Sequence, residues 1–172
     1  MEVVIAPDQR LRVKTKAVKK IAPGLLETIK QMVKVTKKYV DPEGVGLAST
    51  QIGKDEQFFI AKMNDNKFKA FFNPQVLKYA KKTRVYFEGC LSIPDYYGNV
   101  TRPIWVQVSY MDQKGGIHKE KLTGIEAWIF QHEYDHLQGK LFMDKIMEQK
   151  SRLFKVVGKD RAGADIFEEV PA

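Results

Sequence analysis

The sequence of 172 residues contains a single cysteine, Cys90, and so cannot form an internal disulfide bond. It has no apolar run approaching the roughly 18 residues of a membrane span, and residues 1–7 lack the basic start and apolar stretch of a signal peptide. Repeats and low-complexity linkers are also missing. We therefore expect one domain over residues 1–172, located in the cytoplasm and without membrane association.

Acidic residues are the minority charge, since 29 lysines and arginines outnumber 21 aspartates and glutamates and give a net charge of +8. Such an excess favours contact with polyanions, above all RNA. The lysines are spread along the chain, however, without an arginine-rich block or interleaved aromatic residues. We therefore predict an ordinary solvated surface, with transient ribosome contact as the alternative and no sequence-specific nucleic-acid binding.

The hydrophobic pattern predicts an α+β fold, in which antiparallel β-sheets pack around a central buried helix and further helices lie near the N- and C-termini. An amphipathic helix is expected over residues 25–39. Strands should dominate residues 57–122, including a hairpin whose turn covers residues 112–116. A further helix is expected from about residue 143 to 157, followed by a loosely ordered tail over residues 163–172.

The central helix is delimited by sequence signals at both ends. Thr123 and Glu126 have the spacing of a capping box, and Gly139 is well placed to end the helix. Apolar residues between these positions lie on two faces. The helix should therefore be buried in the centre of the fold.

Within this helix, His132, Glu133 and His136 form the pattern His-Glu-x-x-His. Histidines four residues apart lie on one face of a helix and reach one metal ion, with the glutamate beside the bound water. The alternative is a pair of core histidines that bond to backbone carbonyls. Because burying two imidazoles and a carboxylate without a metal is costly, the pattern favours a metal site.

Cys90 is the best third ligand, because a thiolate binds borderline metals well and Gly89 before it permits a tight turn. A small buried hydrophobic residue is the alternative for a free cysteine. Position 142 is Phe142, which excludes the third histidine of a metzincin protease. Three protein ligands leave a fourth position open, as catalytic sites do. Less suitable third ligands are His118, Glu148, Glu168 and Glu169, none of which lies in a supporting motif.

Three segments of the chain resemble the signature motifs of peptide deformylases in sequence, order and spacing. They are residues 44–51 (GVGLASTQ), 88–92 (EGCLS) and 131–139 (QHEYDHLQG). The resemblance runs over nearly the whole chain. One departure is Ser49-Thr50 before the glutamine, where the family commonly has Ala-Pro or Ala-Ala; it concerns loop rigidity more than chemistry.

The resemblance implies removal of the formyl group from formyl-methionine at the start of nascent chains. It implies a ferrous ion as the native cofactor, with zinc, nickel or cobalt able to substitute. Glu133 should accept the proton of the attacking water and pass it to the departing amine. The resemblance also implies that the Gln51 side-chain amide and the Leu91 backbone N–H stabilise the oxyanion.

Substrate choice should come from an apolar slot for the methionine side chain, with ordinary core packing as the alternative for each residue. Three of the predicted residues lie one and two turns before His132 on its own helical stripe. The predicted slot residues are Val45, Gly46, Ile125, Trp128 and Ile129.

Residues behind the ligands are also predicted to support the site. Glu88 and Arg102 are expected to pair and hold the Cys90 loop, and Gln131 or Asp135 to orient a ligand. Surface ion pairing is the alternative for all of them.

Two rival functions remain at this point. A metallo-endopeptidase would use the same histidines and glutamate on internal peptide bonds. A basic RNA- or ribosome-binding module would hold a structural metal, but structural zinc sites usually have four protein ligands and only three good ones are found here.

Overall fold

The computed structural model describes residues 1–171, and no helix among them is both long and apolar enough to cross a membrane. The helices are α1 (Pro23–Thr36), α2 (Gly124–Leu137) and α3 (Phe142–Gln149), with 3₁₀ turns η1 (Gln9–Arg12) and η2 (Ser49–Ile52). The strands are β1 (Gly46–Ala48), β2 (Phe58–Lys62), β3 (Phe68–Tyr79), β4 (Thr83–Cys90), β5 (Ile93–Pro103), β6 (Trp105–Met111), β7 (Ile117–Thr123), β8 (Leu153–Lys159) and β9 (Asp165–Val170).

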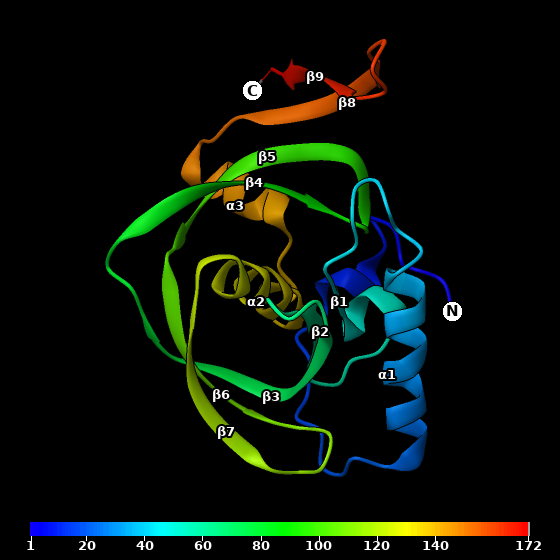
Figure 1. The fold of residues 1–172 in the computed structure, drawn as a ribbon, viewed down its shortest axis with the longest axis vertical. Coiled ribbons are helices and arrows are strands. Elements are labelled where there is room, and N and C mark those ends of the chain that lie inside the picture. The colour runs from blue at the N-terminus through cyan, green and yellow to red at the C-terminus, as the bar shows by residue number, and fades with distance from the viewer. Residues whose placement is uncertain (172) are drawn as a thin grey trace.

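The strands form two antiparallel sheets, one in the order β1-β2-β3-β6-β7 and the other in the order β4-β5-β8-β9. Helix α2 lies between the sheets and contacts strands of both, as Figure 1 shows. The predicted α+β fold around a buried central helix is therefore confirmed. Helix α1 and the β6–β7 hairpin also match the helix and the hairpin expected near residues 25–39 and 112–116.

The first sheet packs against α2 on one face and against α1 on the other. Alternate side chains of a strand point to opposite faces, so neighbouring residues enter different clusters. Phe59 on β2 joins the cluster under α2, whereas its neighbour Phe58 joins the cluster under α1. Phe130 of α2 packs edge to face on Phe59 and Phe71, with ring centroids 5.2 and 5.3 Å apart. This packing fixes α2, and with it the metal-binding motif, against the sheet.

The two ends of α2 differ from each other in how well the sequence predicted them. The predicted capping box at the N-terminus of α2 is wrong. The Thr123 side chain makes no capping hydrogen bond, and the Glu126 carboxylate accepts the backbone N–H of Asn64 at 2.8 Å. The prediction that Gly139 ends the helix is correct. Gly139 has φ of +71°, and a Cβ there would lie 2.5 Å from the Arg12 carbonyl oxygen.

The C-terminal part of the chain corrects the sequence prediction. The helix expected over residues 143–157 is α3, which stops at Gln149, and Lys150 then takes a left-handed conformation with φ of +52°. Most of the tail expected to be loose is strand β9, which pairs with β8. Side chains of this hairpin gain burial only by packing on the second sheet, which local periodicity does not reveal. Ala172 lies outside the described residues.

Candidate active site

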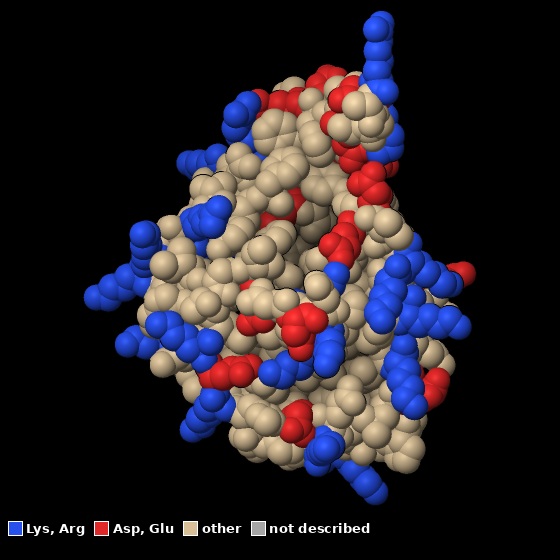
Figure 2. Space-filling model, viewed as in Figure 1, with Lys and Arg blue, Asp and Glu red and all other residues tan. Residues whose placement is uncertain are grey.

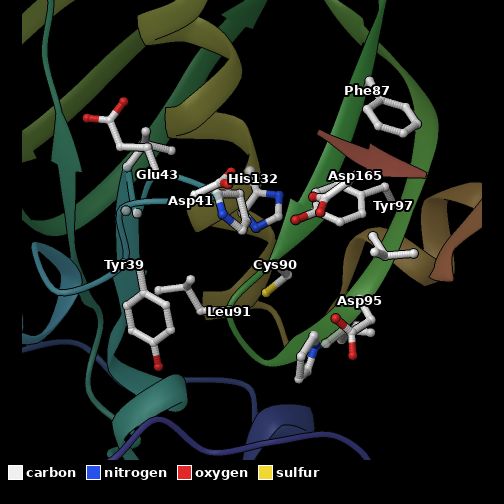
Figure 3. Close-up of a pocket in the computed structure, with 18 of the residues that line it drawn as sticks. Tyr39, Asp41, Glu43, Phe87, Cys90, Leu91, Asp95, Tyr97, His132 and Asp165 are labelled. Atoms are coloured by element: carbon white, nitrogen blue, oxygen red, sulfur yellow. The ribbon is translucent and has the colours of Figure 1, made fainter. Parts of the chain in front are cut away.

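Helix α2 and the end of β4 together build a cluster of three metal-binding side chains. The ligand atoms of Cys90, His132 and His136 lie within 4.8 Å of one another, and the Cys90 Sγ is 3.4 Å from the His136 Nε2. Figure 3 shows Cys90 and His132 close together among the side chains that line the neighbouring cavity. One thiolate and two imidazoles are a donor set that suits a divalent transition metal. The structure thus brings the three predicted ligands together as a metal site.

Glu88 on β4 fixes the orientation of His132. Its carboxylate Oε2 lies 2.9 Å from the His132 Nδ1 and accepts that N–H, which leaves Nε2 for a cation. Arg102 binds both carboxylate oxygens, and the Trp128 indole N–H donates to Oε1 at 2.9 Å. Burial would raise the pKa of Glu88, but hydrogen bonds from His132 and Arg102 outweigh it and lower the pKa to about 2. Glu88 is therefore a fixed anion behind the site.

Arg102 connects two elements that carry the site. Besides Glu88 on β4, its guanidinium donates to the Asp135 carboxylate on α2 at 2.9 Å, and all three groups are largely buried. The predicted pairing of Glu88 with Arg102 is present. Asp135 contacts Arg102, which in turn holds the Glu88 carboxylate beside His132, whereas Gln131 donates to two backbone carbonyls. Of the two residues predicted to orient a ligand, only Asp135 is thus linked to one, through Arg102 and Glu88.

Glu133 lies beside the ligands with its carboxylate largely free. The residue is 3% exposed, and among residues 1–171 its Oε2 has no hydrogen-bond partner. Burial raises the pKa of Glu133 to about 7. Gly46 on β1 packs directly against it, since a Cβ at position 46 would lie 2.4 Å from the Glu133 Oε1. The carboxylate is thus held in a narrow space. Its pKa lies near neutral pH, where a carboxyl group can both accept and release a proton.

Gln51, on η2, directs its amide toward the sulfur ligand. Its carbonyl oxygen accepts the Ala48 backbone N–H at 2.8 Å, which orients the side chain. The amide nitrogen donates to the Ser92 hydroxyl at 3.0 Å and lies 3.4 Å from the Cys90 Sγ. Leu91 lines the same cavity. An N–H donor therefore lies next to the metal ligands, at 1% exposure.

The Ser49-Thr50 pair before this glutamine is buried and hydrogen-bonded. The Ser49 hydroxyl donates to the Glu56 carbonyl at 2.6 Å, and the Thr50 hydroxyl lies 3.5 Å from the His136 carbonyl. These bonds tie the loop to the strand region and to α2. The departure from the family pattern therefore adds polar contacts to the loop that carries Gln51.

A cavity of about 670 Å³ opens beside the metal site. Four of the five predicted slot residues line it: Val45, Gly46, Trp128 and Ile129. Ile125 does not, and its side chain is 61% exposed. Ile125 shares the helical stripe of His132 but lies in the first turn of α2, beyond the part of the helix that the cavity reaches, so the prediction for this residue is wrong.

Sequence reasoning missed the contribution of the C-terminal hairpin to this cavity. Val156, Gly158, Lys159 and Asp165 on β8 and β9 line it, opposite the loop that follows α1. The β-branched pair of residues 156–157 is a strand signal that a helix prediction overrode. No local pattern indicates, however, that the hairpin folds over a site built by residues far earlier in the chain.

Comparison with known proteins agrees with this geometry. The polypeptide deformylase family model matches residues 1–152. A peptide deformylase of Rhodopseudomonas palustris is 38% identical over 158 residues, which cover 88% of this chain and 86% of the relative. One of Mesorhizobium japonicum is 38% identical over 167 residues, covering 92% and 93%. The crystal structure of the Thermotoga maritima peptide deformylase aligns with a TM-score of 0.78 at 35% identity, covering 84% of this chain and 95% of that one.

The family match spans most of the chain and includes all three ligands, Glu133 and Gln51. Its relatives are similar over nearly their full length. The chain belongs to the peptide deformylase family, whose reaction removes the N-formyl group from nascent peptides.

Proposed function

We propose that this chain hydrolyses the N-formyl group of formyl-methionine at the start of nascent polypeptides and releases formate. In this proposal Cys90, His132 and His136 hold the metal, and Glu133 transfers the protons. The observation that carries this proposal is the buried, unpartnered Glu133 oxygen beside a cysteine and two histidines whose ligand atoms converge. A closed structural site would have a fourth protein ligand in place of that free carboxylate.

The donor set supports a ferrous ion as the native metal, with zinc, nickel or cobalt as substitutes. Thiolate and imidazole suit all four, so the proposal for iron rests on the family resemblance. When bound, such a cation would supply Lewis acidity toward water and toward the formyl group. The Glu88 carboxylate, which accepts the Nδ1–H of His132, keeps that ring in the tautomer that binds through Nε2.

Glu133 is the proposed general base and then general acid. Its raised pKa of about 7 lets the carboxylate take a proton from the attacking water and return it to the leaving amine within one cycle. Replacement by glutamine removes both transfers, and such a step typically contributes 10²–10⁴-fold in rate. We therefore expect Glu133→Gln to bind metal normally and to lose at least about 100-fold in kcat.

Gln51 and the backbone N–H of Leu91 are the proposed donors to the oxyanion that forms when water attacks the formyl carbon. The Ala48 N–H fixes the Gln51 carbonyl oxygen, and the amide nitrogen lies 3.4 Å from the Cys90 Sγ, which supports this role for its N–H. Such a preorganised donor is typically worth about 3–4 kcal/mol in the transition state.

Val45, Gly46, Trp128 and Ile129 are the proposed contacts of the methionine side chain, because they line the cavity next to Glu133. A formyl-aspartyl peptide would place a carboxylate among these groups, close to the Glu133 carboxylate. We expect kcat/KM to fall at least about tenfold relative to the formyl-methionyl peptide. Equal turnover of both peptides would contradict the apolar slot.

We also propose that residues 1–172 act as a single catalytic domain in the cytoplasm and meet the ribosome transiently. The net charge of +8 supports the contact, together with exposed Lys30, Lys34, Lys37 and Lys38 on and just after α1. Co-sedimentation with ribosomes at increasing salt tests it. Binding that is absent at low salt would contradict it.

One preparation tests the main proposal. The purified chain, loaded in turn with each metal under anaerobic conditions, should release formate from formyl-Met-Ala and leave casein intact. Removal of the metal by a chelator should abolish release, and Cys90→Ser should change the metal content or metal preference. An enzyme that cuts casein and releases no formate would contradict the proposal.

A further inference from the structure

The C-terminal hairpin, β8 and β9 over Leu153–Val170, lies beyond the 152 residues that the family model matches. It extends the second sheet, since β8 pairs with β5, and it forms the outermost layer in Figure 1. The hairpin is therefore an addition to the part of the chain that carries the metal site.

Aromatic side chains hold the hairpin on the second sheet. Phe167 of β9 packs edge to face on Phe87 and Tyr97, with ring centroids 5.2 and 5.4 Å apart. Phe154 of β8 packs on Phe87 at 5.7 Å. Such contacts are each worth a factor of a few to about tenfold in stability, so the hairpin has a defined position against β4 and β5.

From this position the hairpin borders the same cavity that contains the reacting groups. Val156, Gly158, Lys159 and Asp165 line one side of it, and the buried Glu133, whose Oε2 has no partner among residues 1–171, lines its inner end. The volume of about 670 Å³ is more than one methionine side chain fills. The outer part of the cavity is thus available to peptide residues that follow the methionine.

The outer part of the cavity is acidic, although the protein carries a net charge of +8. Asp41, Glu43, Asp95 and Asp165 line it, and the only ammonium group among its lining residues within 1–171 is that of Lys159. Figure 2 shows acidic side chains beside the hollow and most lysines and arginines on other parts of this face. Figure 3 shows Asp95 and Asp165 on the same side of the cavity as Tyr97, and it shows Asp41 on the opposite side.

Lys159 joins the hairpin to the opposite side of the cavity. Its ammonium lies 2.8 Å from the Asp165 carboxylate and 3.5 Å from the Asp41 carboxylate, which follows α1 in the chain. Asp95 has no ion pair among the described residues. Lys62 pairs with the Glu43 carboxylate, so two lysines neutralise part of this group of four carboxylates, which keeps an excess of negative charge.

We propose that the C-terminal hairpin forms the outer side of the peptide cleft and makes the enzyme favour formyl-methionyl peptides with lysine or arginine at the third or fourth residue. Successive residues of an extended peptide are about 3.3 Å apart, so these residues reach beyond the slot for methionine. Their alkyl stems pack on the rings of Phe87 and Tyr97, and their cations face Asp95 and Asp165. This inference rests on the proposed assignment of the cavity as the site that binds the formyl peptide.

The test compares kcat/KM for formyl-Met-Ala-Xaa-Ser and formyl-Met-Ala-Ala-Xaa, where Xaa is lysine, norleucine or glutamate. The dipeptide formyl-Met-Ala, too short to reach the hairpin, serves as the reference for each protein. We expect lysine to exceed norleucine and norleucine to exceed glutamate at one of the positions. The lysine-to-glutamate ratio should be on the order of tenfold, because each exposed charge pair contributes a factor of about two to five.

Three variants fix the source of the preference. Asp165→Asn and Asp95→Asn should each lower the lysine-to-glutamate ratio at least about twofold, whereas Lys159→Gln should raise it, because it frees two carboxylates. The matched control is Glu168→Gln, on the same strand as Asp165 but not among the cavity-lining residues. A ratio that rises in one variant and falls in the others cannot come from general loss of folding. Salt raised from about 0.05 M to about 0.5 M should shrink the ratio.

Each outcome has one meaning for the inference. The inference is overturned if the lysine peptide is turned over no better than the norleucine peptide. It is also overturned if the lysine-to-glutamate ratio is the same in the four variants as in the parent. A Lys159→Gln ratio below that of the parent also overturns it. Failure to release formate from formyl-Met-Ala contradicts the proposed function instead, so the two proposals fail separately.

Discussion

Gly46 is the position at which the smallest change should separate catalysis from stability. It lies on β1 with its Cα against the Glu133 side chain, and its φ does not lie in the left-handed region, so alanine fits the backbone. An alanine Cβ would be 2.4 Å from the Glu133 Oε1, 2.8 Å from its Cδ and 2.9 Å from its Cγ. Gly46→Ala therefore forces the Glu133 carboxylate to move while leaving every ligand untouched.

The required displacement sets the expected magnitude. Ordinary contact for a Cβ begins at about 3.4 Å, so the carboxylate must retreat by about 1 Å, and a misplacement of that size costs about 100-fold in rate. We expect kcat to fall about 100-fold, with a smaller change in KM. Overpacking costs typically 1–3 kcal/mol, and for a chain of this length that lowers Tm by no more than about 12 °C.

The assay follows formate release from formyl-Met-Ala, together with metal content and thermal unfolding. Gly24→Ala is the matched control, because a Cβ at Gly24 would meet nothing within 4 Å and the residue lies far along the chain on α1. Metal content should match that of the parent, since Glu133 is not a ligand. A Gly46→Ala enzyme that binds metal and keeps most of its kcat would refute the claim that catalysis depends on where Glu133 lies.

Three further predictions concern the groups around the site and the core. Glu88→Gln removes the anion behind His132 and leaves the buried Arg102 guanidinium with Asp135 as its remaining carboxylate partner, so metal affinity should fall about 10–100-fold by metal titration, and unaltered affinity would contradict this. Phe130→Ala removes a fully buried ring and should cost about 3–5 kcal/mol in urea unfolding; a loss below about 1 kcal/mol would show that the cluster collapses around the gap. Burial would raise the pKa of Glu120, but hydrogen bonds from Lys69 and a tyrosine lower it. The stability that Glu120 contributes is therefore present above its unfolded pKa of about 4.3 and lost as pH falls through the lower folded pKa. The difference in unfolding free energy between the parent and Glu120→Gln should shrink from pH 7 to about pH 3, and a constant difference would refute the assignment.

The metal site was predictable because most of its signal is local. His132 and His136 share a helix face whatever surrounds the helix, since four residues make just over one turn. Cys90 lies on a strand of the other sheet, and its choice as third ligand came from chemistry and from the family resemblance. The pairing of Glu88 with Arg102 was predicted as a pair, yet the link from Glu88 to His132 needed coordinates, because no sequence spacing relates β4 to α2.

The predictions that failed share a physical cause. Thr123 and Glu126 have the spacing of a capping box, but Asn64 from another part of the chain offers Glu126 a better donor. Ile125 lies on the predicted stripe, but the cavity ends before it. In both cases a tertiary contact, or its absence, overrode a correct local pattern.

By itself, the sequence determined the central helix, its two imidazoles and carboxylate, and the alternation of strands that places this helix in a core. These properties follow from helix period, strand period and donor chemistry, which act between near neighbours. Only the tertiary structure decided that Glu88 orients His132, that Gly46 confines Glu133 and that the hairpin of Leu153–Val170 borders the cavity. Those contacts join residues distant in the chain, and their geometry is set when the two sheets close around α2.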